Sequence, residues 1–501
     1  MLKRAEIPFS KVVGANYSLV HSSEKGILLM LESQETELTS TEKEIIFSKY
    51  DSALNPIWTA TISVGYLAIM QKHCLDGDDL FFLIKNKKND YNIIKINLQN
   101  GLISLLNYKK LLEIDISHFE VANGILFLGG TVDNMTVVLQ YDYKNSRSPK
   151  VLPSIWQEKV SLNTLIVDQK KESVLVITSE KSNSNSDLFF YSYDLNGKLL
   201  NKWVKKGNNE HSFLAFKTFV PNSEELYLFG TYALGKRDKA QGFYVSRFSN
   251  AEENFTYFYD FSSLNNFFNH LGEKGKEKLL EKVKNKEQKG KVFIHEEDVF
   301  LHDLEIKEDR IYLTAELYVT DLAGYELNPA QTMQRTINES KMSGADRFYK
   351  TLGMDQHQKA IYEGKALYAY KSAVICGFDK TGKLLWDNDF DYQKLKYVEL
   401  SPVLQNIFSQ DSITMLHWQD QNLLLKRSYG NFTLDSLQKF EPKLLDKHER
   451  VEYAEREKII FWYKNYFLIY GFHEITDKEN KRRKVFYLVK IGKTNAKKEE
   501  K

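Results

Sequence analysis

The sequence predicts an all-β protein, a single β-propeller of seven or eight four-stranded blades with a mainly helical insertion between blades five and six. Aromatic residues, which favour strands, make up 13% of the chain, with 29 Tyr and 31 Phe. Strand-length apolar runs recur along it, separated by polar turns. Several runs, such as 80–84 and 226–229, are apolar on both faces and need cover on both sides, which stacked blades supply.

A regular spacing of turns supports the propeller. Successive turn-opening residues lie 46, 45, 52 and 55 residues apart, and then 130. The first four spacings are close to the ~40–50-residue period of propeller blades, and the fifth leaves room for a long insertion. The residues that open these turns are Asp51, Asn97, Asp142, Asp194, Ser249 and Asp379.

The repeats divide the chain as follows. We expect blades one to five in residues 1–262, a helical lysine-rich insertion in 263–300, blade six in 301–322 and 366–398 around a second insertion at 323–365, the last blades in 399–495, and a disordered tail in 496–501. Seven and eight blades both fit, because the seventh repeat is weak and residues 1–20 can complete the last blade. An open array of β-sandwiches or two separate β domains are the alternatives.

One turn resembles those of a known family. The segment 378–386 reads FDKTGKLLW and resembles the D-x-x-T-G-x-x-x-W turn of quinoprotein-like propellers, with one residue fewer between Asp and Thr; looser copies lie at 51–58 and 194–203. The resemblance implies that the tryptophan packs between blades. The calcium site and the cysteine features of quinoprotein dehydrogenases have no match, so it implies a fold and no cofactor. The structural blade-turn residues are Asp51, Trp58, Asp194, Gly197, Trp203, Asp379, Gly382 and Trp386.

A second resemblance concerns residues 302–318 and 373–387. Together with the Lys-, Asn-, Tyr- and Phe-rich composition, they look like uncharacterised exported propeller-like proteins of Bacteroidota. That resemblance implies a cell-envelope location, in the periplasm or on the outer surface, if a signal segment has been removed; otherwise we expect a cytoplasmic protein. Lys3 and Arg4 resemble the start of a signal peptide, but no apolar segment of 7–15 residues follows them.

Composition excludes several classes of protein. The 69 basic and 67 acidic residues give a net charge of +2, so a broadly basic nucleic-acid binder is excluded. Cys74 and Cys376 are too few for a disulfide scaffold; two buried free thiols are favoured over one disulfide. No run approaches the ~20 apolar residues of a transmembrane helix, so we expect membrane association only through a partner or a removed lipid anchor.

The first insertion carries the candidate binding residues. Residues 273–288 read EKGKEKLLEKVKNKEQ, in which Leu279, Leu280 and Val283 recur at helical spacing. The helix is either a partner-docking or phosphate-binding element or a solvated amphipathic helix lying on the propeller. It lacks the interleaved aromatic residues that stack on bases, so we expect no nucleic acid as partner. The candidate partner-binding lysines are Lys274, Lys278, Lys282 and Lys286.

No catalytic motif is recognisable. The sequence has no glycine-rich nucleotide loop, no G-x-S-x-G and no H-E-x-x-H, so we expect no cofactor and assign no catalytic residue. The densest polar cluster is His295-Glu296-Glu297-Asp298 with His302 and Asp303, which is either a divalent-ion site or, as we favour, an exposed acidic turn. His357 beside Asp355 is a weaker metal candidate, and we expect no metal.

Three functions remain open. The leading hypothesis is a non-enzymatic scaffold that mediates protein–protein interaction within a cell-envelope assembly, because a complete repeat set lacks a catalytic motif. The alternative is a carbohydrate-active or other hydrolytic enzyme with carboxylates converging in the central channel, for which upshifted carboxyl groups would speak. The third is a ligand-sensing module that signals to a membrane partner.

Overall fold

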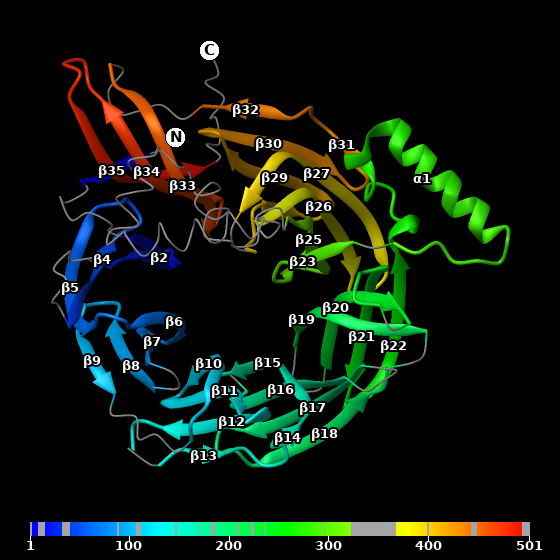
Figure 1. The fold of residues 1–501 in the computed structure, drawn as a ribbon, viewed down its shortest axis with the longest axis horizontal. Helices are drawn as coiled ribbons and strands as arrows, with labels where there is room; N and C mark the ends of the chain where they lie inside the picture. The colour runs from blue at the N-terminus through cyan, green and yellow to red at the C-terminus, as the bar shows by residue number, and fades with distance from the viewer. Residues whose placement is uncertain are drawn as a thin grey trace, which may run out of the picture.

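Eight antiparallel sheets of four or five strands stand around a central axis, as in a β-propeller (Figure 1). The structure is a computed structural model, and it describes residues 3–8, 16–32, 41–87, 90–106, 112–145, 148–169, 171–181, 186–207, 210–221, 225–235, 237–295, 297–321, 367–397, 400–441 and 448–492. The expected insertion at 323–365 and the expected tail at 496–501 lie outside the described residues.

The first four blades are four-stranded meanders, except that blade three has two short outer pieces. Blade one has β2 (Asn16–Ser23), β3 (Gly26–Glu32), β4 (Glu42–Tyr50) and β5 (Pro56–Gly65); blade two has β6 (Ile69–Asp76), β7 (Asp79–Lys87), β8 (Asp90–Asn97) and β9 (Ile103–Leu106); blade three has β10 (Asp115–Ala122), β11 (Ile125–Val132), β12 (Met135–Asp142), β13 (Lys150–Val151) and β14 (Gln157–Glu158); blade four has β15 (Val160–Asp168), β16 (Ser173–Lys181), β17 (Ser186–Asp194) and β18 (Leu199–Lys205).

The other four blades include two with extra short strands and one that joins the two ends of the chain. Blade five has β19 (His211–Phe219), β20 (Glu225–Leu234), β21 (Gly242–Ser249) and β22 (Glu252–Asp260); blade six has β23 (Asp298–Leu301), β24 (Glu305–Lys307), β25 (Arg310–Asp321), β26 (Leu367–Asp379) and β27 (Leu384–Tyr397); blade seven has β28 (Gln405–Ser409), β29 (Ser412–Gln419), β30 (Asn422–Tyr429), β31 (Phe432–Thr433) and β32 (Gln438–Phe440); blade eight has β33 (Arg450–Tyr463), β34 (Tyr466–Thr476), β35 (Arg482–Gly492) and β1 (Lys3–Pro8).

The hydrophobic core lies between the blades. It consists of eight clusters of buried residues, and each cluster draws its members from two neighbouring sheets. One of them joins the two ends of the ring, because Ile27 and Leu29 of blade one pack with Leu468 and Phe486 of blade eight. Strands that are apolar on both faces are therefore covered on both faces, as the sequence predicts.

The ring is closed by the N-terminal strand. β1 pairs antiparallel with β35, from Lys3 opposite Lys490 to Pro8 opposite Val485, and forms the outermost strand of blade eight. The structure thus decides for eight blades and shows that N-terminal residues complete the last one. Closing the ring in this way pairs an edge of blade eight that would otherwise be exposed.

Arg4 holds the closing strand in place. Its side chain is only 2% exposed; Nε donates to Glu6 Oε1 at 2.8 Å, and the guanidinium lies 4.6 Å from the centre of the Tyr487 ring. An Nη2 group lies 3.2 Å from His473 Nδ1. Since arginine has only donors, His473 Nδ1 is the acceptor, and its Nε2 donates to Glu457 Oε1 at 2.9 Å.

The aspartate turns have one common geometry. The Oδ1 atom of the opening aspartate accepts the backbone N–H groups of the second and fourth following residues at 2.7–3.1 Å. The third following residue has a positive φ, which is the reason glycine is frequent there. The three turns pair Asp51 with Leu54 (φ 59°), Asp194 with Gly197 (φ 82°) and Asp379 with Gly382 (φ 77°).

The turn glycines also bring neighbouring blades together. A Cβ atom on Gly382 would lie 2.9 Å from the Phe255 ring of blade five, and one on Gly101 would lie 2.7 Å from the Trp58 ring of blade one. Each of these turns therefore packs against the preceding blade at a distance that only glycine allows.

The three turn tryptophans all contact the clusters between blades. Trp386 donates from Nε1 to Asp411 Oδ1 of blade seven at 2.9 Å, and Trp58 donates to a backbone carbonyl of blade two at 3.3 Å. Trp203 stacks on Phe190 of its own blade, with ring centres 5.1 Å apart, and both pack against the cluster between blades four and five.

The described residues contain one α-helix, α1 (Gly272–Glu287), between β22 and β23. It has 16 residues, so the expected description of 263–300 as mainly helical is not confirmed: short 3₁₀ and other turns precede the helix, and a segment without regular structure follows it at 291–295. No helix among the described residues has the length and apolar character needed to cross a membrane. Cys74 and Cys376 are both buried free thiols.

Replacing Arg4 by Met should destabilise the protein by about 3 kcal/mol, because the change breaks a buried hydrogen-bonded charge network at the closing strand. The measurement is urea unfolding followed by circular dichroism. Lys3→Met is the control: Lys3 makes an exposed hydrogen bond to Asn55, and its loss should cost under about 1 kcal/mol. Equal effects of the two changes would contradict a special role for Arg4.

Gly382→Ala should cost about 2–4 kcal/mol, since it adds both backbone strain and a close contact with Phe255. Gly77→Ala separates these two contributions, because Gly77 has a similar φ of 64° but no neighbour within 4 Å of an added Cβ. The control should lose only about 1 kcal/mol. Tryptophan fluorescence during urea unfolding measures both; a loss at Gly382 no larger than at Gly77 would show that the turn does not pack tightly on blade five.

Candidate functional site

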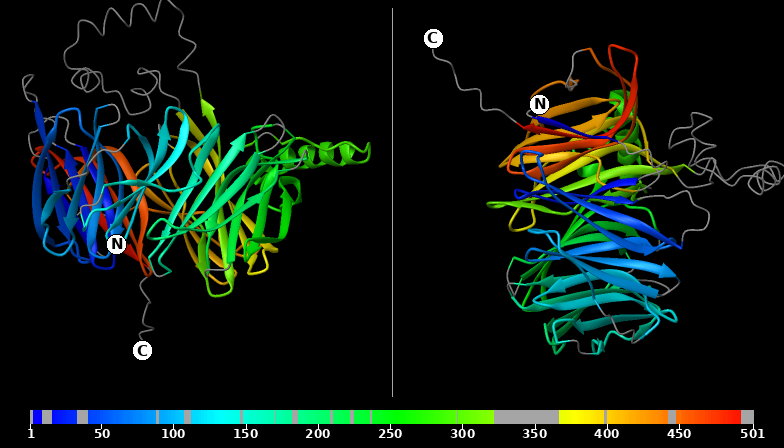
Figure 2. Two further views of the ribbon diagram at one scale, coloured as in Figure 1. Left: turned by 90° about the horizontal axis from the view of Figure 1, so that it is seen from below. Right: turned by 90° about the vertical axis from the view of Figure 1, so that its left-hand side faces the viewer.

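The helix α1 projects from the outer side of the ring between blades five and six (Figures 1 and 2). Two short 3₁₀ turns, η1 (Phe261–Ser263) and η2 (Asn269–Leu271), lead from β22 to its start. Its apolar side chains face inward: Leu279 is half-buried against the cluster between blades five and six, and Val283 is buried. The predicted amphipathic helix therefore exists.

The four predicted partner-binding lysines all lie on the exposed surface of α1, namely Lys274, Lys278, Lys282 and Lys286. None forms an ion pair with another described residue; the Lys286 ammonium lies 5.2 Å from the centre of the Phe293 ring. Residues 272–291 contain eight Lys and four Glu, a net charge of 8 − 4 = +4, whereas the whole chain carries only +2. The helix thus concentrates positive charge on one projecting element.

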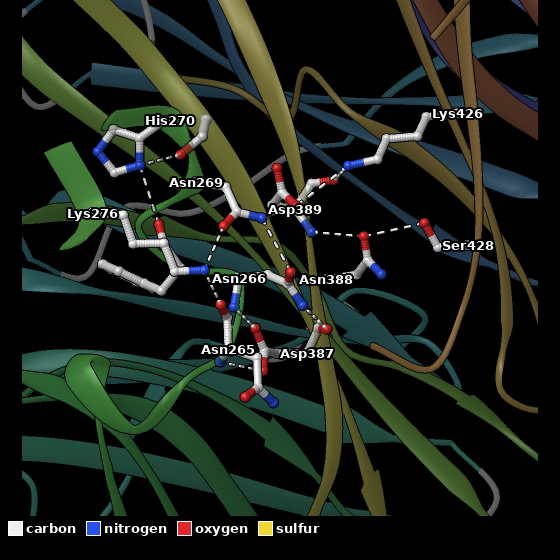
Figure 3. A network of polar contacts seen from close by, with 12 residues as sticks. Asn265, Asn266, Asn269, His270, Lys276, Asp387, Asn388, Asp389, Lys426 and Ser428 are labelled. Carbon is white, nitrogen blue, oxygen red and sulfur yellow. Dashed lines mark hydrogen bonds and ion pairs between the residues drawn. The ribbon is translucent and has the colours of Figure 1, made fainter. Parts of the chain in front are cut away.

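One lysine of the helix has a structural role instead. Lys276 Nζ donates to the backbone carbonyl of Asn265 at 2.5 Å and to Asn269 Oδ1 at 2.8 Å (Figure 3). These bonds tie the first turn of α1 to the linker that precedes it. The sequence alone does not separate Lys276 from its neighbours, because the difference depends on the path of the linker.

A buried carboxylate anchors that linker to blade six. Asp387 of β27 is 1% exposed and accepts the backbone N–H groups of Asn265 at 2.8 Å and Asn266 at 2.6 Å (Figure 3). Asn266 Nδ2 in turn donates to the Asp387 carbonyl at 2.7 Å. Burial raises the pKa of Asp387, and the N–H donors act in the opposite direction.

The same network reaches blade seven. Asn269 Nδ2 donates to Asp389 Oδ1 at 2.9 Å, and Lys426 Nζ donates to the Asp389 carbonyl at 2.7 Å. Ser428 Oγ donates to Asn388 Oδ1 at 3.1 Å. Linker, blade six and blade seven are therefore joined beneath α1 by buried polar contacts, which hold the base of the helix in a defined orientation.

The return from α1 to the propeller is fixed by a second carboxylate. Asp260 accepts from Gln241 Nε2 at 2.6 Å and from Ser262 N at 2.8 Å, and its Oδ1 lies 3.2 Å from His295 Nε2. Burial acts to raise the pKa of Asp260, but hydrogen bonds from His295, Gln241 and Ser262 outweigh it and lower the pKa to about 2. His295 is thus a buried partner of Asp260.

The acidic residues near His295 are paired with lysines. The pairs are Glu297 with Lys371, Asp298 with Lys239, and Asp303 with Lys217. Among the described residues no group of His, Cys, Asp and Glu side chains could hold a metal ion. Glu296, Asp355 and His357 lie outside the described residues.

His302 belongs to a buried contact between blades six and seven. Its Nε2 lies 3.0 Å from Glu316 Oε1, and the Glu316 side chain is fully buried. The same oxygen accepts the backbone N–H groups of Val403 and Leu404, each at 2.8 Å, at the entry to blade seven. Glu316 therefore caps the connection between the two blades.

Two carboxyl groups on the innermost strands have raised pKa values. Burial raises the pKa of Glu120 on β10 to about 7, against the opposing charge of Lys72 on β6. Burial also raises the pKa of Glu305 on β24, against Lys307 and His302. The two belong to blades three and six, with two blades between them.

Sequence reasoning placed the four lysines on a helix but missed the contacts that anchor the start of this helix. The run Asp387-Asn388-Asp389 is the only signal, since three polar residues follow Trp386 in a strand where buried apolar residues are expected. Their partners at 265–269 are about 120 residues away in the chain, so nothing local indicates the contact.

No protein-family model and no curated protein matches the chain. Among solved structures it is similar to the β-propeller domain of the Trilobed protease from Pyrococcus furiosus, with 6% identity and a TM-score of 0.36 over 86% of this chain and 99% of that one. It is also similar to a prolyl endopeptidase (7% identity, TM-score 0.37, 86% of this chain and 51% of that one) and to an apocarotenoid oxygenase variant from Synechocystis (9%, 0.30, 47% and 58%). At these values the likeness carries no activity over to the chain.

The depressed pKa of Asp260 predicts an acid-sensitive contribution to stability. A carboxyl whose folded pKa is about 2, below its ordinary 3.8, stabilises the fold fully above pH ~4 and loses this effect as pH falls toward 2. Asp260→Asn should lower the free energy of unfolding at pH 7, because the new amide would face the Gln241 donor. The difference from wild type should shrink below pH ~4.

Urea unfolding at several pH values measures this difference. The control is Asp303→Asn, which alters a carboxylate whose side chain is 94% exposed and should have little effect at any pH. A difference between wild type and Asp260→Asn that does not change with pH would contradict a lowered pKa of Asp260 in the folded protein.

Proposed function

We propose that the protein is a non-enzymatic β-propeller binding protein, a scaffold that holds an anionic region of a protein partner on α1. The observation that carries this is the set of exposed lysines without ion-pair partners among the described residues, on a helix whose base is fixed by buried contacts. A cell-envelope assembly is the setting that the resemblance to exported proteins suggests.

The anchored base favours binding over the alternative of a helix that only covers the propeller. For cover, the half-buried Leu279 and the buried Val283 would suffice. The contacts of Lys276 and Asp387 instead fix where the outward lysines point. Fixed positive charges attract a carboxylate-rich surface and orient it during encounter.

The test is affinity capture from native cells with the full-length protein carrying K274E, K278E, K282E and K286E together. We expect the variant to lose a partner that the wild type binds stoichiometrically, because each substitution places a negative charge opposite the negative charges of the partner. Lys276 stays unchanged, so the helix remains anchored. Mass spectrometry of the captured proteins is the measurement.

The matched control reverses four exposed lysines elsewhere: K150E, K198E, K206E and K478E. It changes the net charge by the same amount and should retain the partner. Loss of the partner in both variants would show a general charge effect, and retention in both would refute docking on α1.

A second candidate function is hydrolysis by carboxyl groups of the inner strands, as in carbohydrate-active enzymes. The observation in its favour is the raised pKa of Glu120, about 7, which suits a general acid or base at neutral pH. If the wild type is captured alone, glycoside and ester substrates become the next test, with Glu120→Gln as the comparison.

A further inference from the structure

The outer edge of blade seven carries a row of exposed apolar side chains, which we name the apolar edge. Phe432 lies opposite Tyr429 at one end of β30, and Phe440 lies opposite Leu423 at the other. The apolar edge consists of five side chains within twelve residues of β30, β31 and β32 and the turn between the last two, with exposed fractions of 47–74%. They are Tyr429, Phe432, Leu434, Leu437 and Phe440.

The outermost strand of this blade is interrupted. β31 has two residues and β32 three, and both pair with β30 at separate places. The outer strands of other blades also show exposed apolar side chains, but singly, as at Ile57 on β5, or in pairs, such as Leu200 and Val204 on β18. Five exposed apolar side chains beside an interrupted strand are typical of a surface that a partner covers.

Hydrogen bonds connect the apolar edge to the base of α1. The turn between β30 and β31 accepts two of them: Asn431 Oδ1 from the backbone N–H of Asp387 at 2.9 Å, and the Gly430 carbonyl from Asn388 Nδ2 at 3.0 Å. Asp387 is the residue that anchors the linker to α1. Figure 1 shows β31 beside the end of α1 that adjoins the linker. Asp387 thus contacts both elements, the linker through its carboxylate and the turn beside β31 through its backbone N–H.

We infer that the apolar edge and the exposed lysines of α1 form one docking surface for an acidic amphipathic segment of a protein partner. The apolar side chains of this segment would cover Phe432 and Phe440, and its carboxylates would pair with Lys274 and Lys278. The inference rests on the proposed function and adds the chemical class of the partner. We infer that the segment is acidic because the lysines of α1 are positively charged. We infer that it is also apolar on one side because the apolar edge exposes aromatic side chains.

The helix favours a protein over a lipid surface as occupant. A helix that lies on an anionic membrane turns its apolar side chains toward the lipid and keeps a basic polar face. In α1 the apolar side chains Leu279 and Val283 face the propeller, and Glu273, Glu277 and Glu281 alternate with the outward lysines. These glutamates would repel anionic lipid head groups. A peptide, by contrast, can place its carboxylates at the lysines, between one glutamate and the next.

Site-specific photo-crosslinking in native cells tests the inference with the full-length protein. A photoreactive phenylalanine analogue is placed in turn at Phe432, at Lys278 and, as control, at Leu105, which is exposed to 57% on the far blade two. We expect positions 432 and 278 to label the same partner, and mass spectrometry to locate both adducts in one segment rich in Asp, Glu and apolar residues. Leu105 should label nothing in common with them.

The other outcomes each decide a point. Labelling of the partner from Lys278 but not from Phe432 would overturn the inference and leave the proposed function standing. Absence of adducts at both positions would overturn both. Adducts with lipid, with a second copy of this chain, or with a segment that lacks acidic residues would replace the inferred partner by that other occupant.

The affinity of the labelled segment, made as a fluorescent peptide, gives the second measurement. F432S with F440S should weaken binding about tenfold or more, because the variant no longer buries the two rings on binding. L102S with L105S is the matched control and should change the affinity less than about twofold. Equal affinities for both double variants would exclude the apolar edge from the docking surface.

Discussion

Contact between neighbouring sheets is the constraint on which the rest of the structure depends. No blade can bury its own strands, because most of them are apolar on both faces, and each sheet is covered only when it has a neighbour on either side. Blade eight meets this condition where the ring closes: β1 pairs with β35, and Leu29 of blade one packs with Leu468 of blade eight in one cluster. Without this closure, two sheet faces would lose their cover.

Local chemistry explains which parts of this fold are readable from the sequence. The period of the turns, the aspartate that opens them and the glycine three residues later all follow from backbone geometry within a few residues, as at Asp379 and Gly382. The position of α1 is readable for the same reason. The number of blades is not, because it depends on a pairing between residues almost 490 positions apart.

The role of Arg4 is not readable from its neighbours in the sequence. Its side chain lies in blade eight between Glu6, His473 and the Tyr487 ring, and His473 is 469 positions away in the chain. The candidate site has a similar limit. The row of lysines follows from helical spacing, but Asp387 gains its role from backbone groups that lie over 120 residues earlier.

The anchoring of α1 has a consequence for the thermodynamics of association. A lysine-rich segment that moves freely loses conformational entropy when it binds, and this loss reduces the affinity. Here Lys276 and Asp387 have already removed much of that freedom during folding. Binding of the proposed partner would then order mainly the lysine side chains, so that each ion pair formed would contribute more of its energy to the stability of the complex.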